Sequence, residues 1–590
     1  MPRLRHLLLT FAAAGSIIIA AAGVAPAFAR STAGAAAAVD DGDAAGCRLT
    51  AFRLRSDFEA GLDADGGWAG SANAGMVVDA DRPFRIRVEL EADGKPGQPR
   101  RFWLQYRRNG GAWTDLQAAD FPYPLATPPI SVVSNGEYAP GAPTGDLLAG
   151  STAPFQPGAG VVLEATTPGW SAERRAHGEW EWPLVVRRFS DHARTNDAGD
   201  SYELRMADAF GVCTSAVTPV LTVAVPDRLL GGTFVETPGP IGPWQASNGD
   251  LYFLMEPAET SNSLMVVKSS DGGRSWREVD GAHRPATGDL EGVASTLAGD
   301  SLHILHQTSE AVFHHAFRTA DHPTAPDTWW VRDEELAAPE EPPVQVAAIA
   351  ARADGNLVAA YGTPHGLELR FRNRGGRWSE ATTIDPDARA RLSGPMLASG
   401  RGGVVHMAYT DRDGNAWYRR IGADGRPGPR QRVSDQLGRA DTDVGSVLPL
   451  VYLPATDTLM VVYRLANGGL RERRSVAGGP LTEPAVVTDR VVVQGAVDSD
   501  QAGADAVALQ DTAQVLFIEA DSGSLFHAAT DATGRWQPAT LQVDDIDGQW
   551  VRGRPVRRAD GTLVYGYVYD AGSNGGSGMN RYGEVAPAPR

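Results

Sequence analysis

The sequence has few cysteines and no long helical pattern. Only two cysteines, Cys47 and Cys213, occur in 590 residues. No stretch carries apolar residues at the three-to-four spacing of a long amphipathic helix, whereas glycine (67) and proline (40) are abundant. Many tight turns require those two residues. The composition therefore excludes a helical bundle and favours an all-β protein.

Positive charge is also in deficit. The formal net charge is −18 and the isoelectric point is near 5.2. Nucleic acid and acidic membrane surfaces attract basic proteins, so neither is an expected partner. The same negative charge disfavours a polyanionic substrate. A locally basic binding site is still compatible with it, because a ligand responds to the charges near its site and not to the net charge.

Several chemical motifs are missing. The chain has neither a G-x-x-x-x-G-K-[ST] phosphate loop nor a G-x-S-x-G nucleophile elbow. The segment 498–503 starts like a calcium loop, but Ala502 stands at its fifth position and Leu509 at its twelfth, where glutamate is required. We therefore expect no cofactor.

Four histidines lie close together in the sequence, and they are the best candidates for a metal site. A hairpin turning near Ser309 would place His303 with His314 on one face and His306 with His315 on the other. Zinc requires three or four convergent ligands. We therefore predict no metal site in this protein.

One apolar run is long enough to suggest targeting. Arg3 and Arg5 precede the run from Leu7 to Gly23, and Ala27-Phe28-Ala29 is an A-x-A cleavage signature. We predict a cleaved signal peptide at 1–29, a flexible linker at 30–46, and a secreted or periplasmic monomer with no membrane span after cleavage. A retained membrane anchor is the alternative.

The two cysteines bracket a predicted β-sandwich, residues 47–225. Export favours a Cys47–Cys213 disulfide, with two free buried thiols as the alternative. Phe84–Leu90 alternates with period two, which predicts a half-buried strand. The segment Pro122–Trp170 is rich in proline and glycine and predicts a long ordered loop or an inserted hairpin. The sandwich resembles immunoglobulin and fibronectin-III modules.

Similar apolar runs recur about every fifty residues in the rest of the chain, the spacing of one four-stranded propeller blade. There are seven of them: 251–255, 302–306, 357–361, 404–409, 459–463, 515–518 and 563–567. We predict a propeller at 226–590 with seven blades; six blades and an edge strand are the alternative. The last unit lacks a fourth strand, which Thr233–Thr237 could supply.

The turn Ser269-Ser270-Asp271-Gly272-Gly273-Arg274-Ser275-Trp276 carries the clearest local signal. Asp271 and Ser269 can bond the turn's own backbone, and glycine permits positive φ. Degraded copies of this turn end in Trp378 and Trp536. Residues from roughly 231 to 585 thereby resemble the Asp-box, or BNR-repeat, propellers of the sialidase superfamily. The resemblance implies a structural role for Ser269, Asp271, Gly273 and Trp276, because these turns face away from the ligand.

The superfamily contains glycoside hydrolases, polysaccharide lyases and glycan-binding propellers. Sialidases carry an Arg-Ile-Pro motif at the start of the propeller, and residues 239–244 of this chain contain no arginine. A true sialidase is therefore not expected. The resemblance places ligands at the loops joining second to third strands and at the loops between blades.

Carboxylate, tyrosine, histidine and arginine side chains in those loops suit sugar hydrolysis or β-elimination. Tyr361, Tyr409 and Tyr463 share one position in successive units, which also suits blade packing. The candidate catalytic residues are His365, Tyr409, Asp411, Arg464, Glu519 and Asp570. The candidate substrate-binding residues are Tyr567, Tyr569, Asn574, Arg581, Trp550 and Arg412.

The sequence thus predicts an exported carbohydrate-active protein whose partner is a glycan or polysaccharide. A hydrolase or lyase would hold its substrate in a pocket at the propeller axis. The alternative is a non-catalytic propeller that binds glycan or protein, with the sandwich as an adhesion or anchoring module.

Overall fold

The structure is a computed structural model. It describes residues 46–587 except 57, 94–97, 119–127, 173, 189–195, 232–238, 256–263, 280–283, 286–291, 308–310, 321–328, 338–346, 364, 389–394, 435–447, 494–502, 545, 547, 549 and 572–579. The regular secondary structure of the described residues consists of β-strands, apart from one 3₁₀ turn, η3(Arg401–Gly403). The all-β prediction is confirmed. None of these residues belongs to a helix with the length and hydropathy needed to cross a bilayer. The predicted signal peptide lies outside the described residues.

Residues 47–224 form two β-sheets. The larger has the order β12-β1-β3-β9-β7-β6, with β8 added beside β9; the smaller has the order β2-β13-β10-β4-β5, with β11 added beside β10. The bounds of their strands are β1(Cys47–Arg55), β2(Met76–Asp79), β3(Phe84–Ala92), β4(Phe102–Arg108), β5(Thr114–Asp115), β6(Gln117–Ala118), β7(Ile130–Val132), β8(Ala159–Gly160), β9(Ala176–Val186), β10(Ser201–Asp208), β11(Gly211–Val212), β12(Thr214–Ser215) and β13(Val220–Ala224).

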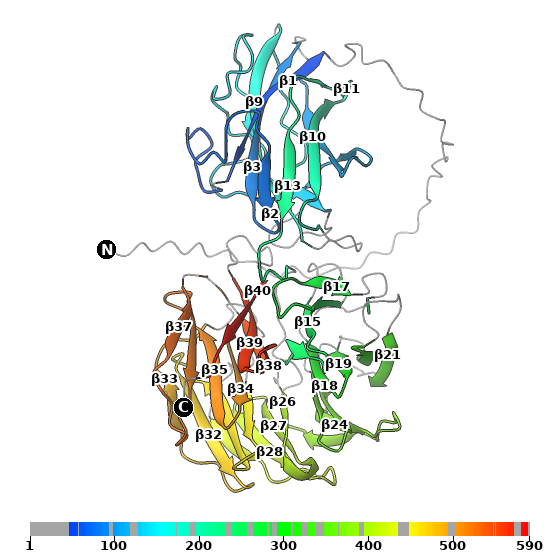
Figure 1. Cartoon of the computed structure of the whole chain (residues 1–590), viewed down its shortest axis with the longest axis vertical. Helices are drawn as coiled ribbons and strands as arrows, with labels where there is room; N and C mark the ends of the chain where they lie inside the picture. The colour runs from blue at the N-terminus through cyan, green and yellow to red at the C-terminus, as the bar shows by residue number, and fades with distance from the viewer. Residues whose placement is uncertain are drawn as a thin grey trace. The chain divides into compact units, whose positions relative to one another are not determined.

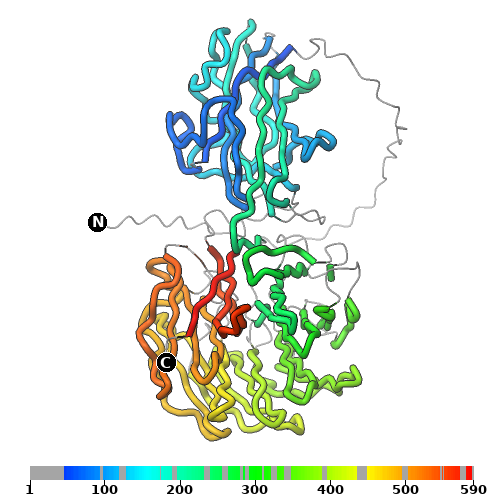
Figure 2. Tube along the Cα trace, viewed as in Figure 1, coloured from blue at the N-terminus to red at the C-terminus, as the bar shows by residue number. Residues whose placement is uncertain are grey.

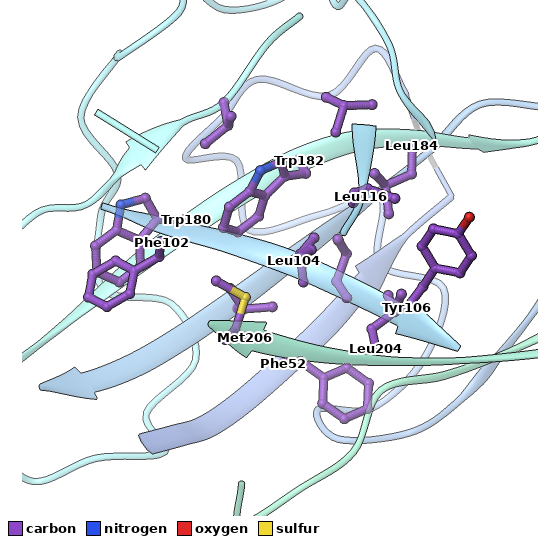
Figure 3. Packing of buried hydrophobic residues seen from close by; sticks show 14 of the residues in the cluster. Phe52, Phe102, Leu104, Tyr106, Leu116, Trp180, Trp182, Leu184, Leu204 and Met206 are labelled. Carbon is purple, nitrogen blue, oxygen red and sulfur yellow. The ribbon is translucent and has the colours of Figure 1, made fainter. Parts of the chain in front are cut away.

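A single apolar core fills the space between these two sheets. Figure 3 shows Trp180 and Trp182 of β9 facing Phe102 and Leu104 of β4, with Met206 of β10 beside them. The rings of Phe102 and Trp180 meet edge to face, with centroids 5.0 Å apart. The predicted disulfide is present and joins Cys47, at the start of β1, to Cys213, between β11 and β12.

The opposite face of the larger sheet corrects one prediction. β3 is buried on both faces, not on one. Its charged residues and those of the adjacent strands are covered by irregular chain from the segment 133–175 and from the β1–β2 connection. The charged residues that this cover buries are Arg55, Arg85, Arg87, Glu89, His177, Glu179 and Glu181. Alternation along a strand shows which residues share a face, but not whether that face meets water.

Seven sheets follow, six of four strands and one of three, each strand antiparallel to its neighbour in sequence. The first three are β14(Trp244–Gln245), β15(Leu251–Met255), β16(Met265–Ser269), β17(Arg277–Val279); β18(Val293–Ala298), β19(Ser301–Gln307), β20(Val312–Arg318), β21(Trp329–Ala337); and β22(Ala347–Ala351), β23(Leu357–Thr363), β24(Gly366–Arg372), β25(Thr382–Asp385). The next three are β26(Met396–Ser399), β27(Val405–Thr410), β28(Ala416–Ile421), β29(Gln431–Ser434); β30(Leu450–Leu453), β31(Thr458–Arg464), β32(Leu470–Val476), β33(Ala485–Thr488); and β34(Ala504–Leu509), β35(Thr512–Ile518), β36(Leu525–Ala529), β37(Thr540–Val543). The last is β38(Val551–Arg557), β39(Leu563–Asp570), β40(Asn580–Val585).

The seven sheets form a ring (Figures 1 and 2). The first strand of each sheet from β18 to β38 contacts the first strand of the next, and β38 contacts β14. The indole Nε1 of Trp244 on β14 donates to Ser295 Oγ on β18 at 2.8 Å and joins the remaining pair of sheets. The fold is therefore a seven-bladed propeller, and we number its blades 1 to 7 in chain order.

Blade 7 has three strands of its own, and its edge is covered from upstream. The segment Thr233–Thr237, predicted to close the ring, lies outside the described residues. The residues just before it pair with β40: Leu230 N donates to Asn580 O at 2.8 Å, and Tyr582 N donates to Arg228 O at 2.9 Å. Leu229 and Arg581 form the antiparallel bridge between these bonds.

Candidate functional site

Each blade has two ends with different loops. Hairpins joining first to second and third to fourth strands lie at one end, which we call the hairpin end. Loops joining second to third strands and successive blades lie at the other, which is the predicted ligand end. Much of the ligand end lies outside the described residues, including 256–263, 286–291, 308–310, 338–346, 389–394, 435–447, 494–502 and 572–579. Asn574 is among them.

Tyr409 on β27 is fully buried between blades 3 and 4. Its hydroxyl donates to Asp385 Oδ2 at 2.5 Å and accepts from Arg419 Nε at 3.1 Å. Burial, together with the nearby Asp385 carboxylate, raises the pKa of Tyr409 well above its usual value. Tyr361 on β23 likewise accepts from Arg370 Nε, at 2.9 Å. The repeated tyrosine thus serves blade packing in the described structure, which is the role that its repetition favours.

Asp411 and Arg412 follow directly in the loop between β27 and β28. The carboxylate of Asp411 accepts from Trp417 Nε1 at 2.7 Å and from the backbone amides of Asp413 and Asn415. Burial acts to raise its pKa, but these hydrogen bonds outweigh burial and hold the pKa below its usual value. Asp411 is therefore ionised and closes its own loop, while the Arg412 side chain is exposed.

The other candidates at this end lie in separate blades. His365 is exposed in the turn between β23 and β24. Arg464, at the end of β31, donates to the carbonyl of Val492 at 2.9 Å. Burial lowers its pKa.

Glu519 is the carboxylate at the ligand end with the most suitable setting for chemistry. It forms an ion pair with Arg490 and accepts from Ser522 Oγ at 2.6 Å. The Ser522 hydrogen bond and the Arg490 guanidinium lower its pKa. An ionised carboxylate suits a nucleophile or a base, but not a proton donor at neutral pH.

Five candidates lie in or next to blade 7. Tyr567 and Tyr569 of β39 are buried with ring centroids 5.7 Å apart, and the backbone amide of the buried Asp570 donates to Trp550 O at 3.1 Å. Trp550 is fully buried and stacks on Phe253 of blade 1, with centroids 6.2 Å apart. These rings seal the joint between the last blade and its neighbours. Arg581 is half-buried on β40.

The turn Ser269–Trp276 folds as its residue types predict. Asp271 Oδ1 accepts from the backbone amides of Arg274 and Ser275, at 3.1 and 2.9 Å, and Ser269 Oγ accepts from Gly273 N at 2.8 Å. Gly273 has φ +86°, and a Cβ there would lie 2.2 Å from the ring of Tyr582. Trp276 is fully buried and donates to Gly273 O. The turn lies at the hairpin end.

In two further turns a side-chain oxygen likewise accepts from the backbone amide four residues later. Asn373 Oδ1 accepts from Arg377 N at 3.0 Å, and Asp531 Oδ1 accepts from Arg535 N at 3.0 Å. Both turns join third to fourth strands, as the sequence repeat predicts.

The four histidines of blade 2 pair as predicted. The rings of His303 and His314 stack with centroids 5.3 Å apart, and those of His306 and His315 stack on the other face with centroids 6.0 Å apart. The two pairs do not converge on one point, because neighbouring residues of a strand point to opposite faces.

A cavity of about 310 Å³ occupies the propeller axis. Its walls are mainly the apolar side chains of the first strands, such as Ile349, Met396 and Leu450. Its polar corner is Asp505, whose Oδ2 accepts from Gly553 N at 2.8 Å and lies 3.5 Å from Arg554 Nη1. Among the described residues that line this cavity, Asp505 is the one carboxylate, whereas glycosidases use a pair.

At the hairpin end the axis opens into a second cavity of about 690 Å³, which shares Ala351 and Ser399 with the first. We call this cavity the arginine mouth. Arg352, Arg374 and Arg401 line it. Arg352 pairs with Asp354 at 3.2 Å.

The other two arginines of the mouth donate to main-chain carbonyls. Arg374 Nε donates to the carbonyl of Asp354 and Arg401 Nη2 to that of Pro454, each at 2.6 Å. Within the described ranges, no carboxylate lies within 4.0 Å of either guanidinium.

The remaining walls of the arginine mouth combine a polar tyrosine with apolar surface. Tyr452 donates to Asp457 and accepts from Arg401 N at 3.0 Å. Leu297, Ala298 and Pro454 supply apolar surface. The mouth is thus a concave site with cationic and aromatic groups, suited to an anion that carries apolar C–H surface.

Sequence reasoning missed the arginine mouth because it placed ligands at the opposite end of the blades. The residues are contributed by hairpins of different blades with no common motif. The available signal was an arginine next to a glycine in a hairpin turn, as at Arg374-Gly375 and Arg401-Gly402.

The chain matches no known family model, and no curated protein matches it in sequence. Distant structural likeness does exist. NanB sialidase from Streptococcus pneumoniae is 9% identical, with 92% of this chain and 93% of that chain aligned and a TM-score of 0.36. The intramolecular trans-sialidase from Ruminococcus gnavus is 10% identical over 60% of this chain and 94% of that one, with a TM-score of 0.34.

A fungal lectin has the same degree of likeness. The Aleuria aurantia lectin, a six-bladed propeller, is 13% identical over 54% of this chain and 98% of that chain, with a TM-score of 0.33. Likeness at this level does not transfer a ligand or a reaction to this chain.

Proposed function

We propose that this chain is an exported carbohydrate-binding propeller whose arginine mouth accepts an acidic sugar. The observation that carries the proposal is the pair of arginines, Arg374 and Arg401, whose guanidiniums bond main-chain carbonyls and are left without a carboxylate partner among the described residues. The chain has a net charge of −18. Such a local positive site therefore favours a small anion, because the negative charge of the surrounding protein repels a large polyanion.

The carbohydrate class rests on the sequence resemblance to Asp-box propellers and on the chemistry of the mouth. A uronate or a comparable acidic sugar offers a carboxylate to a guanidinium and a C–H face to Tyr452 and the apolar wall. Export rests on the predicted signal peptide, and the Cys47–Cys213 disulfide supports it, because such bonds persist in oxidising compartments.

Binding is tested by calorimetry with acidic oligosaccharides and their neutral counterparts at two salt concentrations. We expect acidic sugars to bind more tightly and to weaken with salt. Arg374→Ala and Arg401→Ala should each weaken binding about tenfold, the effect of one charge-assisted contact.

Arg426→Ala is the matched control, since its side chain is 88% exposed and pairs with Asp424 outside the mouth. Equal affinity for neutral sugars, or variants that bind like the wild type, would reject the arginine mouth as the site.

The second candidate is a glycan hydrolase or lyase acting at the ligand end of the axis. The ion pair of Glu519 with Arg490 favours it, because an ionised carboxylate beside a cation can serve as nucleophile or base. Incubation with a polysaccharide panel, followed by reducing ends and by the absorbance of unsaturated uronate, tests it. Both signals mean a lyase, and reducing ends alone mean a hydrolase. Loss of either in Glu519→Gln assigns the residue; no turnover on the panel rejects the candidate.

A further inference from the structure

The larger sheet of residues 47–224 carries several buried charged side chains on its covered face. Arg87 bonds Glu179 at 2.5 Å and Glu181 at 3.1 Å. Arg55 and Arg85 lie 3.3 and 3.2 Å from the same Glu181. Arg87 also lies 3.3 Å from Asp63, so three guanidiniums meet three carboxylates at one end of this face.

Glu89, the first acidic residue of β3, lies two residues beyond Arg87 on the same face of the strand. It is fully buried, and its carboxylate accepts from the Thr50 hydroxyl and, at 3.0 Å, from Gly150 N. Within the described ranges, no cationic side chain lies within 4.0 Å of it as an ion pair. Burying a carboxylate without a counter-charge is costly.

His177 on β9 points its second nitrogen toward the same place. Its Nδ1 lies 2.6 Å from Ala153 O, so Nδ1 carries the proton and donates. Nε2 then offers a lone pair, and it lies 3.4 Å from Asp146 Oδ1, which is also an acceptor. A metal cation between these two atoms would bind both lone pairs. A histidine held by a carbonyl at one nitrogen is the usual arrangement of a metal ligand.

The backbone holds Asp146 from both sides. Gly145 donates its N–H to Asp63 Oδ1 at 2.6 Å, and Leu147 donates to Glu179 Oε1 at 2.8 Å. The Asp146 side chain is 46% exposed, which leaves a path from solvent to the buried His177. The position is thus pre-organised and accessible.

We propose that Glu89, Asp146 and His177 bind a divalent transition-metal ion of the zinc class. One donor atom from each of the three lies within 4.8 Å of the others. Zn–N and Zn–O bonds of about 2.0–2.2 Å at the tetrahedral angle place two ligand atoms about 3.3–3.6 Å apart. The 3.4 Å between His177 Nε2 and Asp146 Oδ1 already has this length. One nitrogen and two carboxylates suit zinc, whereas calcium prefers six or more oxygens.

The ion would supply the positive charge that Glu89 lacks and would fasten the irregular segment around Asp146 to the sheet. Three protein ligands leave a fourth position for water. The site lies far along the chain from the arginine mouth, and its test is independent of the proposed function.

The test uses the purified protein without a polyhistidine tag, stripped with a chelator and dialysed against Zn²⁺. We expect about one bound zinc per chain by elemental analysis, and visible absorption bands when Co²⁺ replaces it. We also expect zinc to raise the melting temperature, with Ca²⁺ and Mg²⁺ having no such effect.

Asp146→Asn and His177→Gln should each lower zinc affinity tenfold or more. Asp79→Asn, an exposed aspartate of β2, is the control and should bind zinc normally. If His177→Gln fails to fold, Asp146→Asn alone decides, because its side chain reaches solvent. Absence of stoichiometric zinc in the wild type, or unchanged affinity in Asp146→Asn, overturns the proposal.

Discussion

His303 Nδ1 lies 3.0 Å from Nε2 of His314, and the two rings are nearly parallel. His314 Nδ1 in turn lies 2.7 Å from Glu334 Oε2 and donates to it. His314 Nε2 is therefore an acceptor, and His303 donates its Nδ1 proton to it. The chain of two buried imidazoles requires a neutral His314, because a proton on its Nε2 would remove the acceptor. Burial lowers the pKa of His303 to about 3.

Acid should destabilise the propeller through such histidines. Burial lowers the pKa of His306, His406 and His527 to about 4. In the unfolded chain a histidine has a pKa of about 6.5. Below that pH the unfolded state binds protons that the folded state does not, so stability falls as pH drops from about 6.5 toward 4, by about 1.4 kcal/mol per pH unit and histidine.

Burial raises the pKa of Glu472, which makes stability change with pH in the opposite direction. Comparing the wild type with His527→Gln isolates the histidine, because Glu472 is present in both proteins. His527 Nε2 bonds Gln514 Oε1 at 2.7 Å, and a glutamine amide can replace that donor. Urea unfolding at pH 7, 6 and 5 should show a pH slope shallower by about 1.4 kcal/mol per unit in the variant. Identical slopes would contradict a neutral buried His527.

Removing the carboxylate of Asp271 should loosen blade 1. Asp271→Ala leaves the amides of Arg274 and Ser275 without their acceptor, and we expect a loss of about 1–3 kcal/mol in unfolding free energy. Asp424→Ala is the control, since that exposed carboxylate accepts from the backbone of Arg426 in a corresponding turn. Calorimetry should show the larger loss for Asp271→Ala; equal losses would mean that the bonds of Asp271 contribute no more than those of an ordinary turn.

The disulfide should stabilise the sheets that it joins. Cys47 and Cys213 are 166 residues apart, and removing a native bridge typically costs about 2–5 kcal/mol. The double variant Cys47→Ala, Cys213→Ala should therefore unfold at lower urea than the oxidised wild type and should match the reduced wild type. A difference between the variant and the reduced wild type would point to effects of the substitutions themselves.

Tyr409 and Asp385 should be energetically coupled. Tyr409 donates to a carboxylate that also lies 3.7 Å from Arg419 and 3.3 Å from Arg430. Thermal unfolding of Tyr409→Phe, Asp385→Asn and the double variant forms a cycle. We expect a coupling energy of about 1–3 kcal/mol. Additive losses would show that the hydroxyl and the carboxylate act independently.

The repeat pattern predicted most of the propeller because each blade is built from local pairings. The run Leu251–Met255 became β15, and the residue types of the turn at Asp271 were sufficient to predict its hydrogen bonds. The two histidine pairs followed from strand alternation alone. In each case the determining contacts lie within about twenty residues.

Features built by distant segments were not predicted. Glu179 is buried because the covering segment donates two backbone amides to it, those of Leu147 and Leu148. Arg401 lines a cavity because Pro454 of the next blade presents a carbonyl to it. Neither contact leaves a periodic trace in the sequence, because irregular chain has no repeat from which its partners can be inferred.

The pairing of Leu230 with Asn580 spans almost the whole propeller in sequence. A chain that emerges gradually from a ribosome or a translocation pore cannot form this contact until β40 has emerged. Until then blade 7 is incomplete, and both β39 and the segment around Leu230 are exposed edges open to other strands. The ring therefore closes in a single step once β40 has emerged. A nascent chain is most exposed to aggregation just before the final residues of β40 appear.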